Sequence, residues 1–97
     1  MNNKDKKKLK GMASLMPSVV QIGKEGLSNA VIDSARAAIT ARELIKAHVL
    51  NNANLDTKET MEELADMLGA ELIQVIGHYG VLFKKKDKKS HFDFITM

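Results

Sequence analysis

The sequence predicts a two-layer α/β (α+β) domain with the element order α-β-α-β-α-β-β, in which a four-stranded mixed sheet carries helices mainly on one face. Three stretches repeat apolar residues at helical spacing, short alternating runs lie between them, and two βα units precede a segment with the form of a hairpin. At 97 residues the chain is long enough for one domain with one core.

The first helix is predicted over residues 2–16. One apolar stripe recurs at i, i+3, i+4 and i+7, formed by Leu9, Met12, Ala13 and Met16. Pro17 ends this helix because the residue before a proline is disfavoured in helical geometry.

Two further helices begin at recognisable caps. The second spans about 27–42, with Ser28 as its N-cap and an inward stripe of Val31, Ala35, Ala38 and Ile39. Asp56 and Glu59 form a capping box that opens the third helix, and Gly69 ends it. That helix directs Met61, Leu64, Ala65 and Leu68 inward and an acidic, phosphate-repelling face outward, made of Glu59, Glu62, Glu63 and Asp66.

Four strands are predicted at 18–22, 43–50, 71–77 and 81–84, with residues 77–80 turning between the last two. Along the second strand Ile45, Ala47 and Val49 lie on one side, and Lys46 and His48 lie on the other. This alternation is typical of a sheet that is half covered.

Residues 1–86 are predicted to form a single domain, followed by a charged, loosely held tail over 87–97. Phe92 and Phe94 either cap the edge of the core or add an edge strand.

The chain has no cysteine and no apolar run long enough to cross a membrane. A cytoplasmic monomer without cofactor, metal or small-molecule substrate is expected.

The charge is segregated along the chain. The net charge is +3, with five lysines over 4–10 and five over 84–89, whereas acidic residues gather over 56–71. Such a distribution favours one surface that faces an anion and one that repels it. Lysine-rich ends that merely solubilise the chain are the alternative.

The segment 19–28 (VVQIGKEGLS) places a strand, a Gly-x-x-Gly turn and a helix start in sequence. Gly23 and Gly26 allow close approach of a ligand, Lys24 adds a cation, and the helix N-terminus offers free N–H groups to a phosphate. This is comparable to the loop with which KH domains hold a nucleic-acid backbone. The alternative is a tight βα turn in which Lys24 and Glu25 form a solvated pair.

Several short segments then resemble the CRM domain family, and in particular its free-standing bacterial YhbY-type members. They are 9–13 (LKGMA), Pro17, 20–28 (VQIGKEGLS), 43–46 (ELIK), 75–77 (VIG) and 81–84 (VLFK). The resemblance implies an RNA-binding module folded like the C-terminal domain of translation initiation factor 3. It also implies association with precursor large ribosomal subunits, as an assembly factor bound to their RNA.

Carried over to this chain, the resemblance places the RNA-contacting loop on Gly23, Lys24, Glu25 and Gly26. The accompanying basic surface falls on Lys10, Lys46 and Lys84. With few aromatic residues and no aromatic pair predicted on neighbouring strands, recognition of RNA shape and backbone is expected. Phe83 is expected in the core.

Catalysis is not expected. The three histidines lie far apart without metal-ligand spacing, and Gly23–Gly26 lacks the Gly-Lys-Ser/Thr of a phosphate-binding P-loop. Two alternatives to RNA binding remain: a protein-interaction module with solubilising ends, and a general nucleic-acid binder for which DNA and RNA compete equally.

Overall fold

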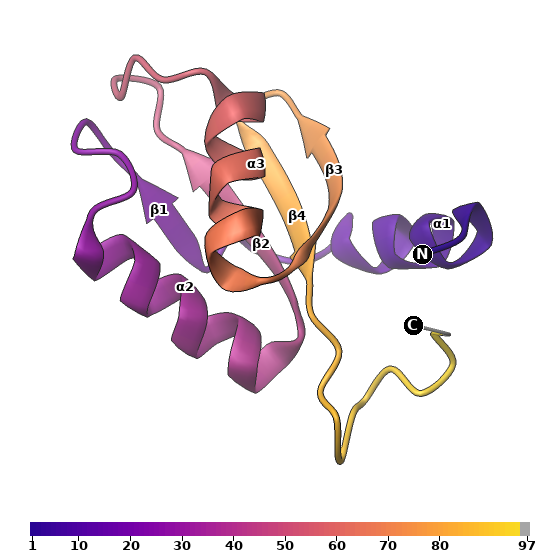
Figure 1. Cartoon of the computed structure of the whole chain (residues 1–97). Helices are drawn as coiled ribbons and strands as arrows, with labels where there is room; N and C mark the ends of the chain where they lie inside the picture. The colour runs from indigo at the N-terminus through magenta and orange to yellow at the C-terminus, as the bar shows by residue number, and fades with distance from the viewer. Residues whose placement is uncertain (96–97) are drawn as a thin grey trace.

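Over its described residues the chain folds into three helices and a four-stranded mixed sheet (Figure 1). The computed structural model describes residues 1–95. Its elements are α1 (Asn3–Ala13), β1 (Val20–Ile22), α2 (Asn29–Arg42), β2 (Leu44–Val49), α3 (Thr57–Leu68), β3 (Glu71–Ile76) and β4 (Tyr79–Phe83). The predicted order of elements and the two-layer α/β class are confirmed.

The sheet has the strand order β1-β2-β4-β3. β1 runs parallel to β2, with Val20 opposite Ala47 and Ile22 opposite Val49, while β4 is antiparallel to both of its neighbours. The ends of β1 and β2 and the β3–β4 turn therefore lie at one end of the sheet, where the Val49 N–H donates to the His78 carbonyl at 2.8 Å.

The main core lies between the sheet and the pair α2 and α3. As predicted, Ile45, Ala47 and Val49 of β2 all face this core, and Met61, Leu64, Ala65 and Leu68 of α3 are buried against it. The caps also agree with the sequence: Ser28 accepts from the Val31 N–H, Asp56 accepts from the Glu59 N–H, and Gly69 is left-handed at the end of α3.

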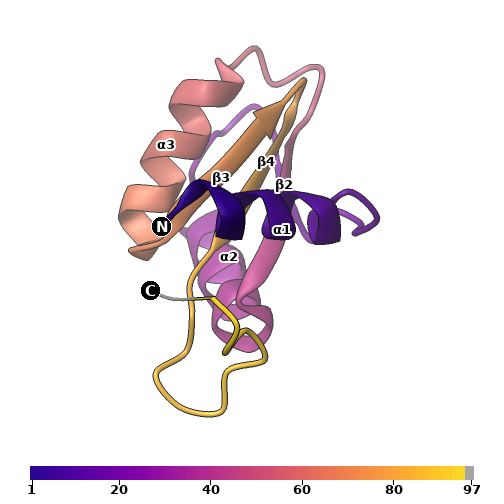
Figure 2. The ribbon, with the colours of Figure 1, turned by 90° about the vertical axis from the view of Figure 1, so that its right-hand side faces the viewer.

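α1 covers part of the opposite face of the sheet, crossing β2, β4 and β3 (Figure 2). Leu9 and Ala13, one turn apart, are buried there against Leu44, Val81 and Phe83. The helix ends at Ala13 rather than at the predicted Met16. The Ser14 hydroxyl donates to the Gly11 carbonyl at 2.7 Å, a local bond of the kind that competes with helix continuation. Met12, predicted in the buried stripe, is exposed.

The described part of the C-terminal segment is packed rather than loosely held, which differs from the prediction. Phe92 and Ile95 are buried beside α1, and Phe92 meets Phe83 edge to face at 5.1 Å between ring centroids. Phe92 therefore caps the smaller core that lies between α1 and the sheet, which we call the second core. Residues 84–95 form no strand. Residues 96–97 of the predicted tail lie outside the described residues.

Glu43 anchors this segment. Its side chain is fully buried between α2 and β2, and its φ of 67° lies in the left-handed region, which is strained for a residue with a side chain. The carboxylate accepts from the N–H groups of Lys86 and His91, at 3.0 and 2.8 Å, and from the Ser90 hydroxyl. Burial raises the pKa of Glu43, but these hydrogen bonds and the Lys86 charge outweigh it and lower the pKa below its usual value.

We predict that Glu43→Gln lowers the free energy of unfolding at pH 7 by about 2 to 4 kcal/mol, because the amide cannot accept all three bonds and leaves buried donors unpaired. Urea unfolding measures this loss. Glu62→Gln, an exposed change on α3, is the control and should stay within about 0.5 kcal/mol of the wild type.

The stability difference between the wild type and Glu43→Gln should depend on pH. Because the native pKa of Glu43 is depressed, its contribution is fully present above the unfolded value of about 4.3 and is lost as pH falls through the native pKa. The stability gap between wild type and Glu43→Gln should therefore narrow below about pH 4. A gap that stays constant down to low pH would show that Glu43 is not held ionised.

Candidate nucleic-acid interface

The GKEG loop, residues Gly23–Gly26, is a tight turn that leaves its two charged residues in solvent. The Gly26 N–H donates to the Gly23 carbonyl at 2.9 Å, and Lys24 and Glu25 are both exposed. Gly26 has a φ of 67°, so its backbone needs the freedom of glycine. The loop borders an open hollow of about 400 Å³ that Ser28 and Asn52 also line.

The helix after the loop adds a positive end to this hollow. α2 begins after Ser28, and its first turn contains no acidic residue, whereas α1 has Asp5 and α3 has Glu59 in that position. The partial positive charge of the α2 N-terminus is therefore not offset by a carboxylate from its own first turn. Glu25 is the one acidic side chain within the GKEG loop.

A second surface lies on the sheet face that α1 and the C-terminal segment leave uncovered. We call it the open face; its side chains are Gln21, Lys46, His48, Gln74, Ile76 and Tyr79. Gln21 stands beside His48 in the β1–β2 register, and Gly23 follows Gln21 by two residues. The open face and the GKEG loop thus adjoin at the same end of the sheet.

The open face holds an aromatic pair that the sequence did not predict. His48 of β2 and Tyr79 of β4 stack with ring centroids 4.2 Å apart and planes 9° from parallel, and the Lys46 ammonium lies 5.9 Å from the Tyr79 centroid. Tyr79 was placed in a turn by its flanking glycines. The turn is shorter, so Tyr79 is the first residue of β4 and lies opposite His48.

The three lysines of the predicted basic surface, Lys10, Lys46 and Lys84, do not lie together in the structure. Lys46 is on the open face, and Lys10 is exposed on α1, one turn before Ser14, which lines the same hollow as Lys46. Lys84 lies at the other end of the sheet, separated from the GKEG loop by the six-residue length of β2, about 20 Å.

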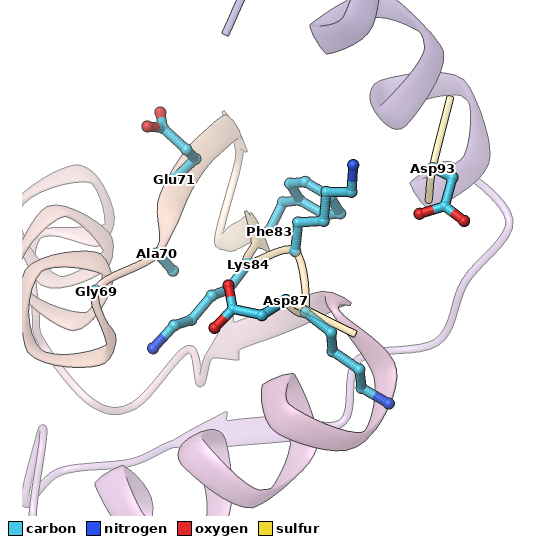
Figure 3. Close-up of a pocket in the computed structure, with 9 residues that line it drawn as sticks. Gly69, Ala70, Glu71, Phe83, Lys84, Asp87 and Asp93 are labelled. Atoms are coloured by element: carbon cyan, nitrogen blue, oxygen red, sulfur yellow. The ribbon is translucent and has the colours of Figure 1, made fainter. Parts of the chain in front are cut away.

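Lys84 has a structural partner. Its ammonium donates to the Leu68 carbonyl at 3.0 Å, where it meets the negative end of the α3 dipole. Figure 3 shows it pointing towards the end of α3, on the wall of a hollow of about 460 Å³ that Asp87, Asp93 and Glu71 also line. Because lysines and carboxylates share this hollow, it lacks the uniform positive charge that would favour a phosphate backbone.

Charge is segregated between the two faces of the sheet. α1 exposes Lys4, Lys7, Lys8 and Lys10 on the side of the open face, and α3, on the opposite side, exposes Glu59, Glu62, Glu63 and Asp66.

Within residues 1–95, no three or more His, Asp or Glu side chains come close enough together to hold a metal ion. No helix in that range is long and apolar enough to span a membrane.

Comparison with known proteins places this arrangement in a family. The model of the CRS1 / YhbY (CRM) domain matches residues 1–84. The chain belongs to this family. It is 31% identical over 93 residues to "Probable RNA-binding protein YqeI" of Bacillus subtilis, covering 96% of this chain and 97% of that protein.

Two further relatives also match over most of the length of both chains. An "RNA-binding protein" of Haemophilus influenzae is 32% identical over 89 residues, covering 91% of this chain and 89% of that protein. The solution structure of the hypothetical protein SAV1595 from Staphylococcus aureus superposes with a TM-score of 0.79 at 34% identity, covering 93% of this chain and 94% of that one. The CRM match therefore spans both the GKEG loop and the open face.

The two glycines of the loop should differ in tolerance. Gly26→Val should destabilise the domain by about 1 to 3 kcal/mol, because a β-branched residue resists a positive φ. Gly23→Ala is the matched control: its added Cβ would make an ordinary contact 3.8 Å from Leu50 and no positive φ is required, so the cost should be under about 1 kcal/mol. Thermal unfolding of the two variants measures the difference, and equal losses would contradict the turn geometry.

Proposed function

We propose that this CRM domain binds RNA by holding its backbone between the GKEG loop and the lysines of the open face. The observation that carries the proposal is that the loop and the α2 N-terminus lie at one end of the sheet. The Lys46 ammonium, from the middle of β2, lies 5.9 Å from the Tyr79 ring centroid near that end, and the acidic surface of α3 faces away. Backbone N–H groups, a helix dipole and lysine ammonium groups all favour phosphate. The names of the Bacillus and Haemophilus relatives support RNA as the partner.

We assign Gly23, Lys24, Glu25 and Gly26 to the backbone contact, with Lys10 and Lys46 as flanking cations. Glu25 is included as part of the loop, and its side chain is exposed. Lys84 is better explained by its bond to the end of α3, and we propose no RNA contact for it. The proposed role is binding without catalysis.

The RNA we propose is ribosomal RNA in precursors of the large subunit, with the domain acting as an assembly factor. The support is the resemblance to the free-standing bacterial members of the family, together with the family match over residues 1–84. We propose that the protein acts in the cytoplasm, as a monomer.

Reversal of the loop cation should weaken binding. Lys24→Asp is expected to lower RNA affinity about tenfold at moderate salt, and to reduce the slope of log affinity against log salt by about 0.7, the value for one phosphate contact to a single strand. A fluorescent RNA titrated at several salt concentrations measures both. The fold should be unaffected because Lys24 is exposed.

Lys88→Asp is the matched control, since it changes the net charge equally but lies on an exposed position of the C-terminal segment, at the other end of the sheet. It should bind almost as well as the wild type. If both reversals weaken binding equally, the GKEG loop makes no special contact. If DNA of the same sequence competes as well as RNA, the domain is a general nucleic-acid binder.

The ribosomal assignment has a separate test. In a lysate separated on a sucrose gradient at low salt, the native protein should migrate with large-subunit particles, and it should leave them when salt is raised or when Lys24 is reversed. Migration at the top of the gradient under all conditions would contradict the ribosomal partner. RNA binding itself would still be tested by the fluorescence titration.

A further inference from the structure

A small hollow opens on the open face beside Tyr79, where α1 ends. It has a volume of about 260 Å³, and its walls come from the end of α1 and from β2, β3 and β4. Ser14, Lys46 and Gln74 supply its polar groups, and Ile76 and Tyr79 supply apolar surface. Ile76 is 59% exposed and Tyr79 is 40% exposed, so both offer contact area that the fold itself does not use.

Tyr79 is partly exposed and lines the hollow, so part of its ring can be reached from there. His48 covers one face of the ring, with a centroid distance of 4.2 Å, and His48 does not line the hollow whereas Tyr79 does. The face that His48 does not cover is turned towards β3, where Ile76 lies opposite Tyr79 and lines the same hollow. The Lys46 ammonium lies 5.9 Å from the centroid of the ring. Packing against His48 restricts the Tyr79 ring, so the platform is formed before a ligand arrives.

The chemistry of this hollow fits a nucleobase. A base has two flat π-faces that stack on aromatic rings and a polar edge that hydrogen-bonds to amides and hydroxyls. Tyr79 provides the ring, and the Gln74 amide provides donors and an acceptor. The Ser14 hydroxyl, whose proton goes to the Gly11 carbonyl, provides an acceptor, and Lys46 provides a cation for the attached phosphate. Among the described residues that line the hollow none is acidic, which agrees with an anionic ligand.

The position of the hollow connects it to the GKEG loop. β2 alone separates β1, which leads into the loop, from β4, which carries Tyr79. Two strand spacings amount to about 10 Å, and both features lie at the same end of the sheet. A short length of RNA backbone can span this distance.

We propose that this hollow receives one unpaired RNA base, stacked on the face of Tyr79 that His48 does not cover, while Lys46 moves to the neighbouring phosphate and the GKEG loop holds the backbone beyond it. The inference rests on the proposed RNA-binding function and narrows its substrate class to RNA with a single-stranded or bulged nucleotide. It replaces the expectation of recognition by shape and backbone alone, because a base inside a continuous duplex cannot reach a side-chain ring.

The test compares two fluorescent probes with the same backbone charge: a single-stranded oligoadenylate of about eight nucleotides, and its abasic counterpart. The wild type should bind the oligoadenylate roughly 5- to 150-fold more tightly, the range for one stacked base. Tyr79→Leu should lose this preference and keep its affinity for the abasic probe, whereas Tyr79→Phe should retain the preference. Lys24→Asp should weaken both probes by the same factor.

A second measurement needs no variant. Tyr79 is the one tyrosine of the chain, which has no tryptophan. Its intrinsic emission should be quenched by the oligoadenylate, after correction for probe absorbance, and should be unchanged by the abasic probe at equal saturation.

The outcomes separate the two proposals. Equal affinity of the wild type for both probes, or an unchanged preference in a folded Tyr79→Leu variant, would overturn the base site while leaving backbone binding intact. Binding of neither probe, nor of a structured ribosomal RNA fragment, would overturn RNA binding and the base site together.

Discussion

Alternation along β2 and β4 sends apolar side chains to both faces of the sheet, and the rest of the structure follows from this constraint. The residues facing α2 and α3 form one core, and Leu44, Val81 and Phe83 form a second on the opposite face. The 11-residue α1 covers only part of that second face. Phe92 and Ile95 cover another part, held by the buried Glu43, which joins the end of α2, the start of β2 and the C-terminal segment.

What remains uncovered is the end of the sheet beside the GKEG loop. Most side chains there are polar or aromatic, which suits a surface in contact with water, and the apolar Ile76 among them is 59% exposed. A cation, a stacked aromatic pair and a glycine turn thereby meet on one rigid framework, while carboxylates gather on α3 across the sheet. This separation gives an anionic ligand one favourable approach and an unfavourable one.

The sequence predicted much of this arrangement because many of its signals are local. Caps at Ser28 and Asp56 and the alternation of Ile45, Ala47 and Val49 depend on neighbours in the chain, and they set the elements correctly. The signals it missed depend on register between distant segments. The stacking of His48 on Tyr79 depends on the residues at which β2 and β4 pair. The burial of Glu43 depends on hydrogen bonds from residues that lie 43 to 48 positions later in the chain. Lys84 lies far from the GKEG loop because the length of β2 separates the two ends of the sheet, and there it binds the end of α3.

We propose that RNA binds where the GKEG loop adjoins the open face. Mapping amide chemical-shift changes on the isotope-labelled protein during titration with RNA tests it most directly. We expect changes at Gly23–Gly26, Lys46, His48 and Tyr79, with little change around Gly69 and Lys84. Changes concentrated instead at Lys84, Lys85 and Lys86, with the loop unaffected, would contradict it and move the interface to the other end of the sheet.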